Sequence, residues 1–419
     1  MNLSKEKTPQ KKSHHWREVL LQGALPLSIA DFASKGANVL VALLIARYFG
    51  PKIYGQYATA ASVCGLFLMA TGIGFEQELT RRGGINKEAI SQSLILNFVA
   101  IGIMSLFAYM ALVIFFSFGT YPQETIYLGI LMGVALIASR FHLPFRHLCL
   151  LLNKSRITAI IQSIATVSVL LLSVCVIYFH LNIIFIIISQ LLVAVCFIVV
   201  WLRWTPQEYL HGKIKKNDLK IFFKNSLPFA FSNIIWITYF NFDTFMLSLL
   251  RTEAEVGIYA GIYRIIGVNY ILGYAITNAF TPKLFKVYHS SSFLFAKIGR
   301  QLVTIVFITG AILASILYFF SYIIIPFIVG ESYLGGIIVS QVLSIAILFR
   351  LLNFGLCEIL TTSNRQNLRV RLEAAMLFIN IILNFILIPL YGGLGAATAT
   401  VFAEVFLLIG CLFICYRAK

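Results

Sequence analysis

Residues 203–224 read RWTPQEYLHGKIKKNDLKIFFK, a basic segment that separates two long apolar parts of the chain. Lys and Arg are retained on the cytoplasmic side of a membrane, so a basic segment between apolar stretches is expected to be a cytoplasmic connection. The apolar parts before and after this segment each have room for six membrane spans. The segment therefore predicts a membrane protein made of two halves.

The same charge bias recurs along the whole chain. Seven short polar segments hold most of the 33 Lys and Arg residues, and two apolar spans separate each segment from the next. The connections on the other side carry only Lys52 and Arg251. This alternation predicts an even number of spans with both termini in the cytoplasm. The seven segments are 5–17, 81–87, 154–156, 203–224, 283–300, 365–371 and 417–419.

The composition excludes a water-soluble protein. Hydrophobic residues make up 59% of the chain and charged residues 12%, and the mean hydropathy is +0.88, which is too apolar for a soluble domain of this length. The net charge of +17 does not indicate a nucleic-acid partner, because the bases lie at membrane edges, where they contact lipid headgroups. The polar, basic start of the chain does not resemble a removable signal peptide. The seven cysteines all lie in apolar stretches without a CxxC pair, so we expect no disulfide framework, metal site or cofactor.

Twelve stretches fit the length of about 20 apolar residues that a membrane span needs. They predict an all-α polytopic membrane protein with about 12 transmembrane helices in two six-helix bundles. We expect a cytoplasmic N-terminal tail (1–22), an N-terminal bundle (23–204), a cytoplasmic basic linker (205–225), a C-terminal bundle (226–416) and a cytoplasmic tail (417–419). The predicted spans are 24–48, 57–76, 92–118, 124–150, 157–180, 182–202, 226–250, 257–281, 301–326, 335–361, 372–391 and 395–416.

The two halves of the chain repeat one motif. A proline opens the first span and another opens the seventh, and a Gly-x-Tyr motif follows each proline at the same distance. Both copies run from the cytoplasmic to the outer side, so the repeat is parallel, with a pseudo-two-fold axis along the membrane normal. Such a duplication predicts a transporter whose cavity lies between the bundles. One offset carries Pro26, Gly55 and Tyr57 onto Pro228, Gly257 and Tyr259.

Three groups of motifs follow one another along the chain: ARYFGPKIYGQY at 46–57 with GIG at 72–74 ahead of Arg81, NFDT at 241–244 with EVGIY at 255–259 and YRI at 263–265, and IPLYGGLGAATA at 388–399. Together they resemble the polysaccharide-transporter family, which includes the Wzx-type O-antigen (lipid-linked oligosaccharide) flippases of the multidrug/oligosaccharidyl-lipid/polysaccharide exporter superfamily. The turn at 180–182 departs from the repeat, because it lacks the glycines of the final hairpin.

The resemblance implies a bacterial inner-membrane protein that flips undecaprenyl-diphosphate-linked oligosaccharides outward by alternating access. It also implies protons or sodium ions and membrane lipids as partners, together with an O-antigen polymerase and a chain-length regulator. The sequence contains no Walker loop, nucleophile elbow or HExxH motif. We therefore expect a non-enzyme that is driven by an ion gradient or by the gradient of the glycan itself.

Two other functions remain open. A multidrug exporter of the same superfamily would handle organic cations, but its pocket should be acidic and aromatic, whereas the spans of this chain contain as many bases as acids. A membrane-bound glycan polymerase or ligase usually needs a sizeable outer loop, and every outer connection here is short. The lipid II flippase branch is disfavoured, because it carries fourteen spans.

Ionisable side chains inside the spans are the natural site candidates, because they are costly at bilayer depth. The planar fork of an arginine matches the oxygens of a phosphate. We therefore expect Arg350 and Arg264 to attract the diphosphate and acidic sugars, with Lys35 and Arg140 as further cations. Asn38 on span one joins this set. The aromatic members of the predicted substrate site are Tyr263, Tyr270 and Trp236.

Some of these positions allow a second interpretation. Asp31 and Lys35 are four residues apart, so they could form an intrahelical ion pair or line the central cavity. Tyr263 and Tyr270 suit sugar stacking, but tyrosines near span ends also form interfacial belts. For Tyr259 we favour the belt.

Proton-driven alternating access needs a carboxylate that is charged in one state and neutral in another. Glu358 lies two turns from Arg350 on span ten, so a proton and an anionic substrate could compete for that arginine. Asp243 coincides with the acidic position of span seven in the family that the chain resembles. We rank these two carboxylates above Asp31 and Glu404.

Two further features concern helix shape and helix contacts. Pro144 is expected to break or kink span four. Glu373, Asn380 and Asn384 form one stripe on span eleven, which suits hydrogen bonds between helices.

Overall fold

The computed structural model describes residues 25–416 apart from 73, 87, 213 and 215. Within these residues every regular element is a helix, which confirms the predicted all-α class. The two predicted tails, 1–22 and 417–419, lie outside the described residues.

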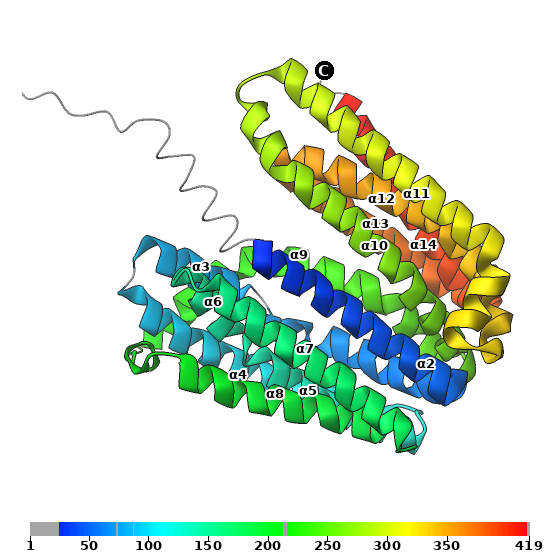
Figure 1. The fold of residues 1–419 in the computed structure, drawn as a ribbon, viewed down its shortest axis with the longest axis horizontal. Helices are drawn as coiled ribbons and strands as arrows, with labels where there is room; N and C mark the ends of the chain where they lie inside the picture. The colour runs from blue at the N-terminus through cyan, green and yellow to red at the C-terminus, as the bar shows by residue number, and fades with distance from the viewer. Residues whose placement is uncertain (1–24, 73, 87, 213, 215, 417–419) are drawn as a thin grey trace, which may run out of the picture.

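The helices form two lobes (Figure 1). We call α2 to α8 the N-lobe and α10 to α14 the C-lobe, while α9 contacts helices of both. The N-lobe contains α2 (Leu25–Phe67), η2 (Leu68–Gly72), α3 (Phe75–Ile85), α4 (Ala89–Phe118), α5 (Gln123–Arg140), α6 (Leu143–Leu151), α7 (Ser155–Tyr178) and α8 (Ile184–Trp204). It is followed by η3 (Gln207–Leu210), α9 (Lys216–Leu250), α10 (Glu253–Tyr288), α11 (Ser292–Val329), η4 (Glu331–Gly336), α12 (Ile337–Thr362), α13 (Gln366–Tyr391) and α14 (Gly393–Tyr416).

Ten stretches of the described chain are long and apolar enough to cross a membrane. The first of them, Ile29–Ile85, contains two of the predicted spans, and the more polar α9 is not among the ten. With that first stretch counted as two spans and α9 as one, the helices account for the twelve predicted spans.

Glycine and proline place the breaks within the long helices. The backbone of α2 leaves helical geometry at Gly50, whose φ of 73° is accessible to glycine at little cost, and Pro51 starts the next helical segment. The predicted break in span four is confirmed, because α5 ends at Arg140 and α6 begins at Leu143 with Pro144 in its first turn.

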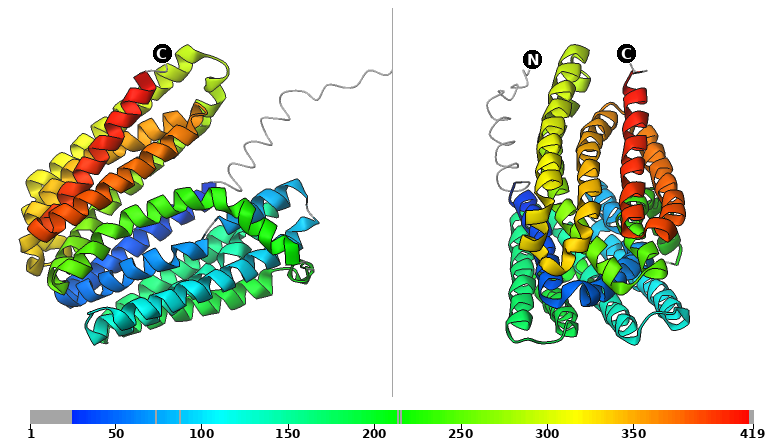
Figure 2. Two further views of the ribbon diagram at one scale, coloured as in Figure 1. Left: turned by 180° about the vertical axis from the view of Figure 1, so that it is seen from behind. Right: turned by 90° about the vertical axis from the view of Figure 1, so that its right-hand side faces the viewer.

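The two lobes meet at one end and diverge at the other, so that the molecule has the shape of a V (Figure 1 and Figure 2). The short connections with few basic residues, such as those between α9 and α10 and between α11 and α12, lie where the lobes meet, which we call the joined end. The basic connections, such as the one between α10 and α11, lie at the opposite, open end.

Two glycines make the contact between the lobes at the joined end. A Cβ atom on Gly55 would lie 1.8 Å from the carbonyl oxygen of Glu253, and a Cβ atom on Gly257 would lie 1.8 Å from that of Pro51. The offset that relates the two glycines also relates Pro51 to Glu253, so each helix makes the same contact with the other. This reciprocal crossing of α2 and α10 confirms the pseudo-two-fold relation between the bundles.

Hydrogen bonds between the lobes surround the glycine crossing. The carboxylate of Glu253 accepts hydrogen bonds from Gln56 at 3.1 Å and from Thr125 at 3.0 Å. The hydroxyl of Tyr333 donates to the backbone oxygen of Ala46 at 3.0 Å. These contacts tie the C-lobe to the N-lobe at the joined end.

The crossing leaves no room for a side chain, so we expect Gly257→Ala to destabilise this arrangement. Its added methyl group would meet the backbone of Pro51, and overpacking of this kind costs about 1–3 kcal/mol. The midpoint of thermal unfolding in detergent should fall, as measured by fluorescence-detected size exclusion. Gly102→Ala in α4 is the control, because nothing lies within 4 Å of its added Cβ. Equal midpoints for the two variants would contradict the close crossing.

Candidate functional site

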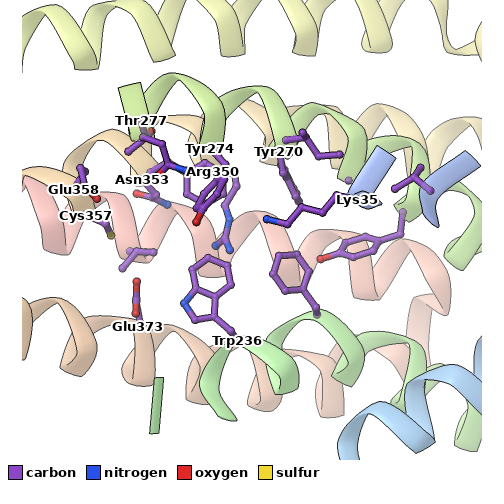
Figure 3. Close-up of a pocket in the computed structure, with 18 of the residues that line it drawn as sticks. Lys35, Trp236, Tyr270, Tyr274, Thr277, Arg350, Asn353, Cys357, Glu358 and Glu373 are labelled. Atoms are coloured by element: carbon purple, nitrogen blue, oxygen red, sulfur yellow. The ribbon is translucent and has the colours of Figure 1, made fainter. Parts of the chain in front are cut away.

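A cavity of about 730 Å³ lies between the lobes. Its walls come from α2, α9, α10, α12 and α13, so both halves of the chain contribute (Figure 3). Of the eight predicted substrate-binding residues, seven line this central cavity: Arg350, Arg264, Lys35, Asn38, Tyr263, Tyr270 and Trp236.

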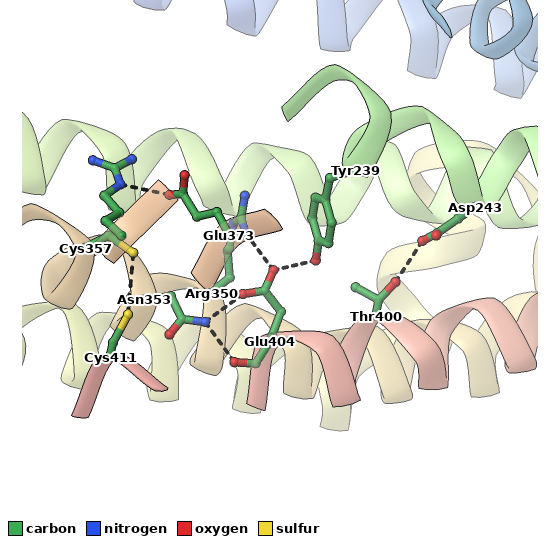
Figure 4. A network of polar contacts seen from close by, with 10 residues as sticks. Tyr239, Asp243, Arg350, Asn353, Cys357, Glu373, Thr400, Glu404 and Cys411 are labelled. Carbon is green, nitrogen blue, oxygen red and sulfur yellow. Dashed lines mark hydrogen bonds and ion pairs between the residues drawn. The ribbon is translucent and has the colours of Figure 1, made fainter. Parts of the chain in front are cut away.

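Arg350 is almost fully buried in the cavity wall and is paired with an acid that sequence reasoning did not assign to it. Its Nη1 atom lies 2.7 Å from Oε1 of Glu404 (Figure 4). From the sequence, the carboxylate expected to act together with Arg350 is Glu358, two turns away on the same helix. The guanidinium also lies 4.4 Å from the ring centroid of Trp236 and 5.0 Å from that of Phe354, at cation–π distance. The positive charge of Arg350 is therefore already balanced within the C-lobe.

The carboxylate of Glu404 is held by two further side chains. The hydroxyl of Tyr239 donates to it at 2.5 Å, and the amide of Asn353 donates to it at 2.8 Å. Glu404 is fully buried and both of its carboxylate oxygens accept hydrogen bonds, whereas Nε and Nη2 of Arg350 are buried without a hydrogen-bond partner among the described residues. The helical period places Tyr239 in one stripe with Trp236 and Asp243, but Tyr239 is not among the site residues predicted from the sequence.

A second ion pair balances the charges of α13. Arg369 and Glu373 line the central cavity, and their Nε and Oε1 atoms are 2.8 Å apart. Their spacing of four residues on one helix is a signal for such a pair, but the sequence analysis assigned Glu373 to contacts between helices.

Two cations of the central cavity have no carboxylate partner in the described part of the chain. They are Lys35 on α2 and Arg264 on α10, and both side chains are exposed to the cavity. The ammonium of Lys35 lies 4.4 Å from the ring centroid of Tyr274. Glu358 also lines the cavity, and its carboxylate takes part in no salt bridge among the described residues. The free charges of the cavity are thus two positive and one negative.

The structure places Asp31 and Arg140 away from the central cavity. Asp31 accepts hydrogen bonds from Arg146 and Gln162, both at 2.9 Å, so the intrahelical pair with Lys35 is not formed. Arg140 lies beside Gly72, where α2 gives way to α3, and it does not line the cavity. Each of these side chains serves a contact within the N-lobe.

Asp243 on α9 is the centre of a buried polar cluster that α9 forms with helices of the C-lobe. Its carboxylate accepts hydrogen bonds from Asn384 at 2.6 Å, from Tyr259 at 2.8 Å and from Thr400 at 2.8 Å. Asn380 accepts a bond from Asn384 at 3.1 Å. The preference for an interfacial belt at Tyr259 was wrong, because this residue is buried and its hydroxyl binds the carboxylate. No basic side chain forms a salt bridge with Asp243 in the described residues.

The sequence profile of polysaccharide biosynthesis proteins matches residues 20–288, which is well over half of the chain. The chain belongs to this family. Its resemblance to polysaccharide transporters is thereby confirmed. A curated relative, the capsular polysaccharide biosynthesis protein CapF of Staphylococcus aureus, is 26% identical over 212 residues, which are 49% of this chain and 54% of that protein. The match thus spans about half the length of this relative.

Solved structures confirm the two-bundle membrane fold. The chain superposes on the lipid II flippase MurJ in an inward closed conformation with a TM-score of 0.74 and 17% identity, over 93% of this chain and 87% of that chain. An inward-facing multidrug resistance MATE transporter of the MOP superfamily gives a TM-score of 0.74 at 16% identity, over 92% and 94% of the two chains. At these identities the likeness concerns the fold.

The pairing of Arg350 predicts a stability difference between two glutamates of the C-lobe. Removing the charge of one partner in a buried ion pair costs about 3–5 kcal/mol, so Glu404→Gln should lower the midpoint of thermal unfolding in detergent. Glu358→Gln is the matched control, because this carboxylate forms no ion pair in the described structure. If both variants unfold at the parent's temperature, the Arg350–Glu404 pair does not contribute to stability.

Proposed function

We propose that this protein flips a lipid-linked oligosaccharide across the membrane by alternating access. The observation that carries the proposal is a pair of cations, Lys35 and Arg264, in a cavity between two lobes that are joined at one end. They contact the ring of Tyr274 and the hydroxyl of Tyr54, respectively, but neither has a carboxylate partner among the described residues, and we call them unpartnered in this sense. A diphosphate carries negative charge that can pair with these cations, and the guanidinium of an arginine can bind it through two parallel hydrogen bonds. Family membership supports a polysaccharide precursor as the cargo, and we propose undecaprenyl diphosphate as its lipid carrier.

We infer that the open end faces the cytoplasm of a bacterium and that the protein lies in the inner membrane with both termini inside. The basic connections at the open end support this orientation, because Lys and Arg are retained on the cytoplasmic side. In this orientation the structure is inward-facing. The TM-scores agree, since the inward-facing MATE transporter gives 0.74 and the outward-facing one gives 0.62, at 15% identity over 96% and 95% of the two chains. The cargo would enter the central cavity from the inner leaflet and leave it on the outer side of the membrane.

The charge of the central cavity argues against a cation exporter, and the short outer connections argue against a glycan polymerase or ligase. An exporter of organic cations needs an acidic cavity, and unpartnered Lys35 and Arg264 would repel such a substrate. A glycan polymerase or ligase needs catalytic groups in an aqueous outer domain, and the outer connections of the described chain are short turns. O-antigen polymerases and chain-length regulators therefore belong among the proposed partners, and this chain would supply their substrate.

Asp243 is our first candidate for the coupling of transport to an ion gradient. A carboxylate at bilayer depth needs a proton or a cation, and this one is bound only by neutral groups. Its partner Tyr259 follows Gly257 by two residues on α10, so a change in the occupancy of Asp243 can reach the glycine crossing. Asp31 and Glu404 are ion-paired and are less suited to exchange protons. Glu358, which faces the cavity, is the second candidate.

Loss of Lys35 or Arg264 should strongly reduce transport without unfolding the protein. We expect Arg264→Gln and Lys35→Gln to reduce surface polysaccharide about tenfold or more, because a charge-assisted hydrogen bond contributes about 1.5–3 kcal/mol. Arg264→Lys should restore only part of the activity, since lysine lacks the fork. The measurement is the amount of surface polysaccharide in a strain that lacks its own gene for this protein and expresses the variant, with the level of the variant determined in the membrane.

Lys286→Gln, an exposed position at the other end of the same helix, serves as the control for a lost positive charge. Wild-type polysaccharide levels in Arg264→Gln would remove that arginine from the proposed site.

The coupling role of Asp243 can be tested in proteoliposomes that contain lipid-linked oligosaccharide from the host strain. Imposed pH and sodium gradients are applied separately, and one of them should accelerate transport by the parent protein. Asp243→Asn keeps the size of the side chain and one of its two acceptor oxygens but loses the charge, so the variant should no longer respond. Glu331→Gln, an exposed position in η4, should respond like the parent. A full response of Asp243→Asn would place the coupling ion elsewhere.

A further inference from the structure

A second cavity, of about 450 Å³, lies inside the N-lobe. We call it the N-lobe pocket. Its walls come mainly from α2, α5, α7 and α8, with Arg146 of α6 and Arg264 of α10, and two of its lining residues, Asn38 and Arg264, also line the central cavity. The two cavities therefore adjoin at the unpartnered Arg264, and a diphosphate bound there would lie at the mouth of the N-lobe pocket.

Hydroxyl and amide groups dominate the polar lining of the N-lobe pocket. They come from all four helices of the wall, and each can both donate and accept hydrogen bonds. The ring of Tyr57 adds a flat aromatic surface, of the kind on which sugar rings pack. The main hydroxyl and amide residues are Ser34, Ser139, Gln162, Thr166 and Gln190.

Apart from Arg264 at its mouth, the N-lobe pocket has one charged lining residue, Arg146, which is ion-paired, and two polar atoms of the pocket lack a partner. Arg146 is paired with Asp31 at 2.9 Å, and Nε2 of Gln162 donates to the same carboxylate at 2.9 Å. The Nε atom of Arg146 and the Oε1 atom of Gln162 remain buried without a hydrogen-bond partner. A buried polar group without a hydrogen-bond partner destabilises the protein. A ligand hydroxyl could satisfy the donor, the acceptor or both.

Comparison of the two lobes indicates that the N-lobe pocket suits an uncharged ligand. The offset that relates the lobes carries Tyr57 onto Tyr259 and Val41 onto Asp243. Val41 and Tyr57 both line the N-lobe pocket. The second half of the chain thus has the buried carboxylate of Asp243 bound to Tyr259, whereas the first half has Val41 and Tyr57 beside the N-lobe pocket.

We propose that the N-lobe pocket binds an uncharged sugar of the oligosaccharide, the one attached directly to the diphosphate. This inference rests on the proposed function, because it takes the diphosphate to bind at Arg264. The central cavity then holds the rest of the head group. With Arg264 at the mouth bound to the diphosphate, an acidic sugar would find no further cation without an ion-pair partner in the N-lobe pocket, and a lipid chain would leave its hydroxyl and amide groups unpaired.

Protection of single cysteines from N-ethylmaleimide tests the proposal in nanodiscs of the full chain without its native cysteines. Ala165→Cys reports on the N-lobe pocket, Asn278→Cys on the central cavity, and Ile164→Cys on the exposed side of α7. The probes are lipid-linked oligosaccharide from the host strain and sugar-free undecaprenyl diphosphate. We expect the oligosaccharide lipid to slow labelling about tenfold at positions 165 and 278, and the sugar-free lipid to do so only at 278. Position 164 should not change.

Three other outcomes would overturn the proposal, and they can be told apart. Equal protection of position 165 by both lipids would mean that diphosphate or lipid, and not sugar, occupies the N-lobe pocket. Protection at 278 alone by the oligosaccharide lipid would leave the proposed function intact and exclude the sugar site. If neither cavity is protected by either lipid, the proposed function fails as well.

A variant that fills the N-lobe pocket provides a second, independent measurement. Ala165→Leu should reduce surface polysaccharide about tenfold in the complemented strain, while undecaprenyl diphosphate should still protect Asn278→Cys in the same background. Val167→Leu also introduces a leucine on α7, but on the exposed side of the helix, and should behave like the parent. Normal polysaccharide levels in Ala165→Leu would contradict a sugar site in this pocket.

Discussion

The backbone contact between Gly55 and Gly257 is the constraint on which the rest of the structure depends. Because neither residue has a side chain, α2 and α10 approach until a Cβ atom on either glycine would overlap a carbonyl oxygen of the other helix. The contact is reciprocal, so it lies on the pseudo-two-fold axis, and we propose that the two lobes rock against each other about it. A close contact at the joined end allows the lobes to diverge towards the open end and leaves the central cavity between them (Figure 1).

The charges inside the lobes are organised around this cavity. The Arg350–Glu404 and Arg369–Glu373 pairs neutralise most of the C-lobe, and Arg146–Asp31 does the same in the N-lobe. Among the described residues that line the cavity, the cations without an ion-pair partner are Lys35 and Arg264, one from each half of the chain, on the two helices that form the glycine crossing. A cargo that bridges these two cations would pull directly on the elements that set the angle between the lobes. Asp243 reaches the same crossing through Tyr259, so cargo and ion would act on one contact.

Much of the architecture follows from the sequence, because hydropathy, basic connections and the glycine and proline positions act locally. The spans, the break near Pro144 and the repeat that relates Gly55 to Gly257 are all visible in this way. Partners across helices were harder to predict, since a helical period indicates which face a residue occupies but not which helix packs against it. For this reason the sequence pointed to Glu358, on the same helix, as the carboxylate that acts with Arg350, whereas Arg350 forms its ion pair with Glu404 of α14. Asp31 was likewise weighed with Lys35, although Arg146 is its partner, and the buried role of Tyr259 was missed.

The central claim is that the lobes rock about the glycine crossing, and the most direct test is a pair of distances measured by double electron–electron resonance in nanodiscs. One pair of spin labels, at Lys154 and Ser290, spans the open end, and a second pair, at Phe118 and Tyr391, spans the joined end; all four positions are exposed. When lipid-linked oligosaccharide and the coupling ion are added, a population should arise in which the first distance is shorter and the second is longer. Distances that do not change, or that change in the same direction at both ends, would contradict the account.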